Sequence, residues 1–182
     1  MKKYRLAEET TKVGNRTLYR IQALIDFGNV KEGDIGGYIE SEKNLSQCCD
    51  AWVYDDACVS GNARVSDDAW ISDDACVYGN ARVSGNSWVS GDACVSGNAC
   101  VSGDADIKTT GDICSMSGFG SEYRTTTAFR TKNGDVHVSC GCFFGSLDAF
   151  CQRVESTHGN TLYGREYKKM IEMLKIHFEV EP

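Results

Sequence analysis

The sequence predicts a mainly β protein whose central segment is a triangular parallel β-helix. An aliphatic residue recurs every six positions, and a small residue stands two positions before each of them. The residue in between cycles through Trp, Cys and Arg from Trp52 to Cys94, and the cycle breaks at Cys100. A period sustained in this way indicates a solenoid. The aliphatic residues are Val53, Val59, Val65, Ile71, Val77, Val83, Val89, Val95, Val101, Ile107 and Ile113.

Each six-residue unit predicts one short strand and one corner. Because side chains alternate across a strand, the small and the aliphatic residue point to the same side and line the interior. The corner pairs are Gly-Asn, Gly-Asp or Asp-Asp, which tolerate the positive φ of a tight turn. The small residues are Ala51, Ala57, Ala63, Ala69, Ala75, Ala81, Ser87, Ala93, Ala99 and Ala105, followed by Gly111.

The outward residue of each unit indicates how many units make one turn. Tryptophan recurs every 18 residues at Trp52, Trp70 and Trp88, and cysteine recurs with the same period. Arg64 and Arg82 occupy the third position of the cycle. Three units per turn predict a prism with a tryptophan, a cysteine and an arginine column on its three faces, and with turns about 4.8 Å apart.

The units V-S-G-N-A-R and V-Y-G-N-A-R resemble the hexapeptide of left-handed parallel β-helix proteins. The spacing alone does not determine the handedness, because it also fits a right-handed triangular helix of the bactofilin kind. The resemblance implies a left-handed helix. RTLYRIQALIDFGNVKEGDIGGYIESEKNLS is similar to the leader segment of hexapeptide-repeat proteins common in phages and prophages. TAFRTKNGDVHVSCGCFFGSLDAFCQRVESTHG resembles a module at the end of some of them. That group has no settled activity, so the resemblance implies a phage or prophage origin but no particular reaction.

Flanking domains are expected to cover both ends of the prism, because an exposed end coil invites edge pairing. Residues 1–47 contain short strands and a Gly-rich turn and predict an amino-terminal β cap. Residues 48–115 hold the β-helix. Residues 116–182 predict a small α+β domain with the element order ββαα.

The elements of that last domain follow from local signals. TTTAFRT and VHVSCGCFF are expected as two strands around the hairpin signal Asn133-Gly134. Ser146 is an N-cap for a first helix that ends at His158-Gly159. A second helix is expected to bury one apolar stripe. That stripe consists of Tyr163, Tyr167, Met170, Ile171, Leu174 and Phe178.

Charge and composition exclude several classes of protein. Of the net charge of −7, residues 48–115 account for the whole imbalance, with three Lys/Arg against eleven Asp/Glu. Such a surface repels phosphate, so direct nucleic-acid binding is not expected. The chain shows neither a signal peptide nor an apolar run long enough to span a bilayer, which predicts a cytoplasmic protein. The resemblance to phage and prophage proteins implies that this is the cytoplasm of an infected or lysogenic bacterial host. The ten cysteines are expected to be reduced.

The sequence argues against an enzyme. Hexapeptide acyltransferases use a histidine as general base, usually beside a loop extruded from a coil. Here His137, His158 and His177 all lie outside the unbroken units. The absence of histidine from the coils also argues against a zinc site on the prism. Cys140 and Cys142 are expected to lie on one buried strand face and not to be metal ligands. We therefore expect no catalytic residue, no metal and no cofactor.

Two groups of residues are predicted to make contacts. A large aromatic stripe of Trp52, Trp70, Trp88, Tyr54 and Tyr78 is expected to lie against the carboxy-terminal domain or a second subunit, in preference to serving as a ligand platform. It favours a homo-oligomer, and the resemblance to left-handed hexapeptide prisms, which usually assemble as trimers, implies a trimer. The predicted binding residues of the last domain are Arg124, Ser121, His158, Tyr163 and Arg165. The acidic corner residues have a plainer interpretation as a solvated edge than as a Ca²⁺ site.

Three hypotheses for function remain open. In the first, a non-enzymatic oligomer inhibits a host protein, such as a defence enzyme. Its prism is a scaffold that presents the carboxy-terminal binding domain, and the acidic surface of the prism imitates nucleic acid. In the second, the oligomer sequesters a small anionic nucleotide between subunits. The third is an acyltransferase of the hexapeptide kind.

Overall fold

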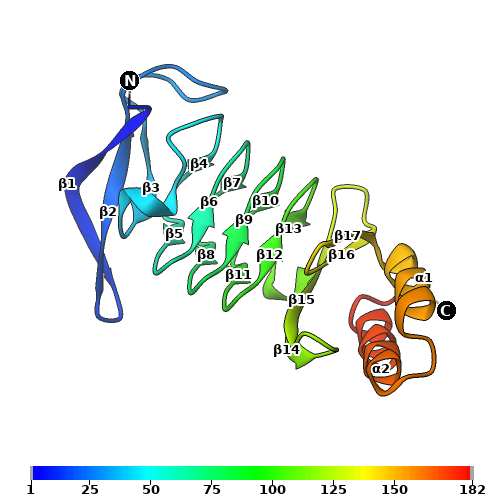
Figure 1. Ribbon diagram of the computed structural model, residues 1–182. Coiled ribbons are helices and arrows are strands. Elements are labelled where there is room, and N and C mark those ends of the chain that lie inside the picture. Colours follow the sequence, from blue (N-terminus) through cyan, green and yellow to red (C-terminus); the bar gives the residue numbers. More distant parts are fainter. Residues whose placement is uncertain (1, 181–182) are drawn as a thin grey trace.

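The computed structural model describes residues 2–180 and confirms the mainly β fold with a triangular parallel β-helix. The stacked coils form the middle of an elongated molecule, with a β hairpin at one end and an α+β domain at the other (Figure 1). The hairpin consists of β1 (Tyr4–Val13) and β2 (Arg16–Ala23). No helix within residues 2–180 is long and apolar enough to cross a membrane.

Ten of the predicted units form a two-residue strand each. They stack in parallel with an offset of 18 residues, as in Cys58↔Cys76, so three units per turn are confirmed. The strands are β4 (Trp52–Val53), β5 (Cys58–Val59), β6 (Arg64–Val65), β7 (Trp70–Ile71), β8 (Cys76–Val77), β9 (Arg82–Val83), β10 (Trp88–Val89), β11 (Cys94–Val95), β12 (Cys100–Val101) and β13 (Asp106–Ile107). The tryptophan face consists of β4, β7, β10 and β13, the cysteine face of β5, β8 and β11, and the arginine face of β6, β9 and β12.

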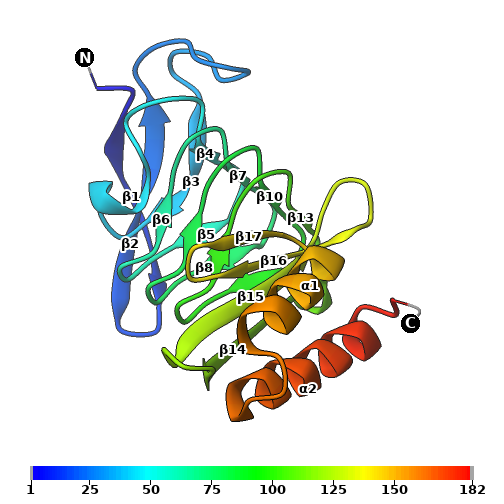
Figure 2. The ribbon, with the colours of Figure 1, turned by 45° about the vertical axis from the view of Figure 1, so that its right-hand side comes forward.

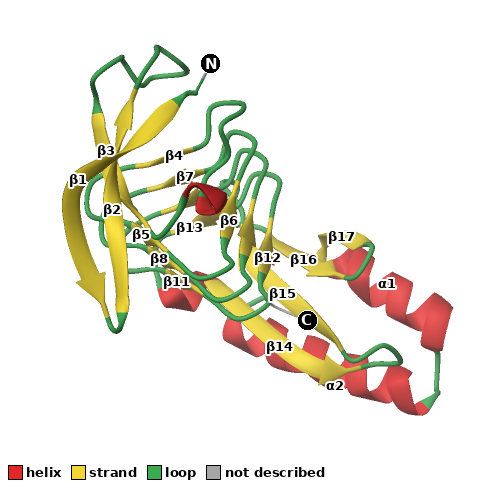
Figure 3. Ribbon diagram, turned by 60° about the vertical axis from the view of Figure 1, so that its left-hand side comes forward, coloured by secondary structure: helices red, strands yellow, loops and turns green. Residues whose placement is uncertain are grey.

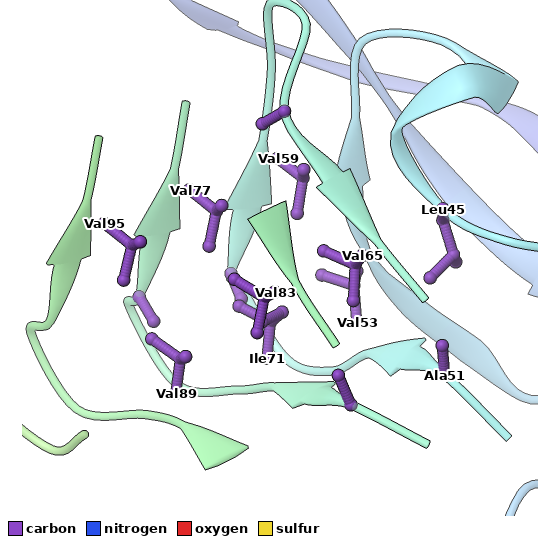
Figure 4. Packing of buried hydrophobic residues seen from close by; sticks show 14 of the residues in the cluster. Leu45, Ala51, Val53, Val59, Val65, Ile71, Val77, Val83, Val89 and Val95 are labelled. Carbon is purple, nitrogen blue, oxygen red and sulfur yellow. The ribbon is translucent and has the colours of Figure 1, made fainter. Parts of the chain in front are cut away.

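The interior of the prism holds only small and aliphatic side chains at the repeat positions, as predicted. Val77 and Ala75 are both 0% exposed, and the neighbouring coils repeat this arrangement (Figure 4). Ser87 is the one polar residue in the small column. Its hydroxyl donates to the Ser84 carbonyl at 2.6 Å, so the buried oxygen is satisfied.

The acidic corners have a structural role. Asp67 and Asp73 adopt φ values of 58° and 57°, a region that most side chains avoid. The carboxylate of Asp73 accepts a hydrogen bond from the backbone N–H of Gly91 at 2.9 Å, and that of Asp67 accepts from Gly85 at 3.1 Å. Each aspartate therefore links its own coil to the next one, which offsets the cost of the left-handed backbone.

The coils begin earlier than the six-residue period predicts. Strand β3 (Ile35–Ile39) pairs in parallel with β5, and Leu45 forms a parallel bridge with Val65. Both pairs, Ile39↔Val59 and Leu45↔Val65, are 20 residues apart, whereas Val53↔Ile71 returns to 18. Two extra residues between Leu45 and Val53 therefore interrupt the period, and the first coil lies partly within the segment predicted as the cap.

The amino-terminal segment covers the first coil. The indole of Trp52 is 1% exposed and packs edge-on against Phe27, with ring centroids 5.3 Å apart. The buried ammonium of Lys3 donates to the carbonyls of Cys49 and Ala51 at 3.1 and 2.8 Å. Burial lowers the pKa of Lys3 to about 8. These contacts satisfy carbonyls that would otherwise remain open at the end of the solenoid.

The carboxy-terminal domain has four strands instead of the predicted two. β14 (Ile113–Phe119), β15 (Arg124–Arg130), β16 (Val136–Cys140) and β17 (Phe143–Ser146) form one antiparallel sheet in that order. The last aliphatic residue of the repeat, Ile113, pairs with Phe129 in this sheet rather than stacking on a coil. VHVSCGCFF is two strands, because Gly141 has φ 62° and forms a turn. The prediction that Cys140 and Cys142 share a strand face is therefore wrong.

The sheet separates two hydrophobic cores. Phe129 belongs to the core of the prism, whereas Ala128 and Val138 pack with the helices α1 (Leu147–His158) and α2 (Leu162–His177). Both helices lie on the side of the sheet that faces away from the coils (Figures 2 and 3). The predicted N-cap is confirmed, since the Ser146 hydroxyl accepts from the N–H of Ala149 at 3.2 Å.

The buried column predicts a large effect for a charge placed inside it. Val77→Asp should unfold the prism cooperatively at a cost of several kcal/mol, because the carboxylate finds no partner in the interior. Arg82→Ala, on the exposed side of the next strand, should change the free energy of unfolding by less than about 1 kcal/mol. Denaturant unfolding followed by circular dichroism measures both variants. A wild-type midpoint for Val77→Asp would contradict the inward placement.

Candidate functional site

The five residues of the predicted aromatic stripe lie in different environments in the structure. Trp52 lies under the amino-terminal cap, not under the carboxy-terminal domain or a second subunit. Trp70 packs between Tyr54 and Trp88, with centroid distances of 5.6 and 6.0 Å, and Trp88 is 43% exposed. Tyr78 follows a strand of the cysteine face and contacts the thiol of Cys94. The five side chains therefore do not form one stripe, and their role in an assembly stays a prediction.

The predicted binding residues of the carboxy-terminal domain are only partly brought together. His158 lies edge-on to Tyr163 at 6.4 Å and stacks on Tyr167 at 5.5 Å. Tyr167, which we assigned to the helix core, is 8% exposed and links this cluster to the sheet. Arg124 lies next to Gly141 and close enough to Tyr167 to influence its pKa. The cluster is therefore mainly a packing contact.

The two remaining candidates, Ser121 and Arg165, are exposed. Ser121 lies in the loop between β14 and β15, and Arg165 lies in the first turns of α2. Their binding role stays a prediction.

The arginine face carries a hollow that the sequence did not predict. Arg64 and Arg82 are direct neighbours across β6 and β9, and both are exposed. Both line a hollow of about 600 Å³ that extends from the short 3₁₀ helix η1 (Glu42–Asn44) to Cys100. A second hollow of about 450 Å³ shares Arg64, Arg82 and Cys100. We refer to the two together as the arginine trough.

A polar ladder forms one side of the arginine trough. The side-chain amide of Asn62 donates to Asn80 at 3.0 Å, and that of Asn80 donates to Asn98 at 3.0 Å. These hydrogen bonds fix the orientation of the amides, and each donating NH₂ group keeps a second N–H. Ser66 and Ser84 also line the hollow. The trough therefore presents ordered hydrogen-bonding groups around its two guanidinium groups.

The trough has an excess of positive charge in an acidic chain. Among residues 2–180, neither Arg64 nor Arg82 forms an ion pair. Lys43 adds a third cation. The acidic residues of the lining are Glu42, which is paired with Lys2 at 2.6 Å, and Asp67, whose carboxylate accepts a hydrogen bond from the backbone N–H of Gly85. Neighbouring strands lie about 4.8 Å apart, and two unit charges at that separation repel each other by roughly 1 kcal/mol in water. An anion bound between them would remove this repulsion.

Two of the coil cysteines, Cys58 and Cys76, are poor nucleophiles. The pKa of Cys58 is raised to about 11, mainly by burial and to a smaller extent by the neighbouring thiol of Cys76. Burial also raises the pKa of Cys76. Thiols with raised pKa values stay protonated at neutral pH, and the thiolate is the reactive form. No group of three or more His, Cys, Asp or Glu in the described part of the chain is placed to hold a metal ion.

Comparison with known proteins identifies the repeat. Residues 57–73 and 75–91 match the YdcK beta solenoid repeat. The chain is also 36% identical over 81 residues to a protein named "Uncharacterized acetyltransferase YdcK" from Escherichia coli (strain K12). This match covers 36% of the chain and 25% of the relative, so the chain spans about a quarter of that protein's length. The similarity supports a repeat β-helix protein, and the activity in the relative's name belongs to that protein.

The raised thiol pKa values predict slow alkylation. At pH 8 a thiol with a pKa of about 11 is ionised to roughly one part in a thousand. Cys58 should therefore remain largely unmodified by iodoacetamide at pH 8 and react faster as the pH rises towards 11. Peptide mass spectrometry of the native protein follows this site. Alkylation of Cys58 at the rate of free glutathione at pH 8 would contradict the assignment.

Proposed function

We propose that the protein is a non-catalytic binding protein whose arginine trough captures a small anionic ligand. The observation that supports this proposal is the pair Arg64 and Arg82, which are direct neighbours on adjacent strands and line a hollow. Both are exposed, and neither forms an ion pair with any residue from 2 to 180. Guanidinium groups bind carboxylate and phosphate oxygens in pairs, and they hold their charge at every physiological pH.

The dimensions of the trough favour a small ligand over a polymer. It begins at η1 of the amino-terminal cap and reaches β12, where the N–H of Cys100 donates to the Thr127 hydroxyl of β15. Because neighbouring strands are about 4.8 Å apart, its length is roughly 15 Å. The acidic corners outside it oppose the approach of a long polyanion. Sequestration of a small phosphate-bearing molecule is therefore our preferred form of the hypothesis.

The inhibition of a host protein remains the second candidate. Its support is the acidic balance of residues 48–115, which is distributed over exposed corners such as Asp55 and Asp73. These carboxylates would attract a basic partner surface over a distance of about one Debye length. Both proposals include a phage or prophage origin, a cytoplasmic location and a homo-oligomer. The expected form of the oligomer is a trimer.

An acyltransferase is the third candidate, and the name of the E. coli relative favours it. The coils of this chain contain no histidine to act as the general base. Acetyl-CoA hydrolysis and transfer assays with the purified chain distinguish this candidate from a binding protein.

The trough proposal predicts a specific loss of anion affinity. Calorimetric titration with inorganic pyrophosphate should show binding that weakens about tenfold or more in Arg64→Ala and in Arg82→Ala, because each variant removes a charge-assisted hydrogen-bond donor. The affinity should also fall as the salt concentration rises.

Arg153→Ala provides a matched control for these variants. It removes the same charge from an exposed position on α1 and should leave pyrophosphate binding unchanged. Equal losses in all three variants would show that only the net charge matters. Wild-type affinity in both trough variants would contradict the proposed site.

A further inference from the structure

A separate hollow of about 340 Å³ lies beside the tryptophan face. The coils contribute Asp50, Asp68, Trp70 and Trp88, and the β15–β16 hairpin contributes Lys132. Lys132 is anchored to the coils at both of its nitrogen atoms. Its backbone N–H donates to the Asp104 carbonyl at 3.0 Å, and its ammonium donates to the Asn86 carbonyl at 3.0 Å. The hollow is therefore complete only when both parts of the chain are present.

Two indole rings form the apolar walls of this hollow. The rings of Trp70 and Trp88 are 6.0 Å apart and meet at an angle of 76°. The indole N–H of Trp88 donates to the Ser72 hydroxyl at 3.1 Å, which holds the ring in place and satisfies its polar edge. Tyr54 supports Trp70 from another side. Two steeply inclined aromatic rings form part of an aromatic cage, which attracts alkylated ammonium groups through the ring quadrupoles.

Charged groups of both signs line the hollow. Asp50 and Asp68 lie one coil apart, and the N–H of Asp50 donates to the Asp68 carboxylate at 3.2 Å. Neither carboxylate forms an ion pair with any residue that the structure describes, and the same is true of Lys132. Carboxylates beside aromatic rings favour a cation, and the lysine favours an anionic group on the same ligand.

We propose that this hollow binds a small zwitterion with a methylated ammonium group at one end and a carboxylate or phosphate at the other. The ammonium group lies against Trp70 and Trp88 near the two aspartates, and the anionic end lies at Lys132. The volume is at the lower end of the range for small-molecule sites, which suits a ligand of this size. The site shares no residue with the arginine trough, so the proposal does not depend on the trough.

Three probes of similar size separate the forces involved. Glycine betaine carries both charges, choline carries only the ammonium charge, and 3,3-dimethylbutan-1-ol has the shape of choline with a neutral carbon. Calorimetric titration, with tryptophan fluorescence as a second readout, should give the tightest binding for glycine betaine. Choline should follow, and the neutral alcohol should bind about tenfold more weakly than choline.

Single substitutions test each wall of the site. Trp88→Leu should abolish binding of the two cationic probes, because it removes the more exposed indole. Asp68→Asn keeps the side-chain shape and should weaken both cationic probes. Lys132→Met should remove the preference for glycine betaine over choline while choline still binds. The control Tyr123→Leu removes a 70% exposed aromatic ring from another part of the chain and should change none of these affinities.

Several results would overturn the zwitterion proposal. It is wrong if the neutral alcohol binds as tightly as choline, if none of the three probes binds, or if Trp88→Leu retains wild-type affinity with a native circular dichroism spectrum. An unchanged preference for glycine betaine in Lys132→Met would also contradict it. Arg64→Ala and Arg82→Ala should leave glycine betaine binding intact, so a failure of the anion site is distinguishable from a failure of this one.

Discussion

The interior of the prism accepts one small and one aliphatic side chain from each strand, and the rest of the structure depends on this constraint. Ala75 and Val77 show the arrangement, which every coil repeats with a fully buried pair. Because the interior is uniform, the coils stack in strict register, and outward residues 18 positions apart become direct neighbours. The surface is thus a set of columns whose chemistry is free to vary while the core stays the same.

This stacking explains which surface groups have a structural role. Like charges placed opposite each other on adjacent strands destabilise a sheet. Asp73 lies one coil from Asp55, yet its carboxylate accepts a backbone hydrogen bond from Gly91 and so supports the corner. Arg64 and Arg82 are also stacked, and neither forms an ion pair with any described residue, although the Asp67 carboxylate lines the same hollow. We propose that a bound anion compensates the repulsion within this pair.

The repeat made most of the fold predictable, and the exceptions have local causes. The period determined the strands of the coils, and the caps at Ser146 and Gly159 determined the first helix. Two extra residues before Val53 concealed the first coil from the six-residue pattern. Strand β14 was missed because Ile113 continues the aliphatic period although it pairs within the antiparallel sheet.

The sites were harder to predict, because segments distant in the sequence build them. The arginine trough joins η1 to three coils, and the second hollow joins Lys132 of a hairpin to the corner of the coils. The period predicted the arginine column but not the hollow above it. The tryptophan column was predicted as one stripe because its period is regular, whereas the cover over Trp52 comes from Phe27 and Tyr4 in the irregular cap.

A crystal structure of the protein grown with tungstate is the most direct test of the anion site. Tungstate is an oxyanion similar to phosphate in shape, and its anomalous scattering locates it without ambiguity. If the arginine trough binds anions, the strongest anomalous peak should lie between the guanidinium groups of Arg64 and Arg82. This peak should be lost in the Arg64→Ala variant. Peaks confined to other surfaces, with the arginine trough empty, would contradict the central claim that this face of the β-helix is a binding site for a small anion.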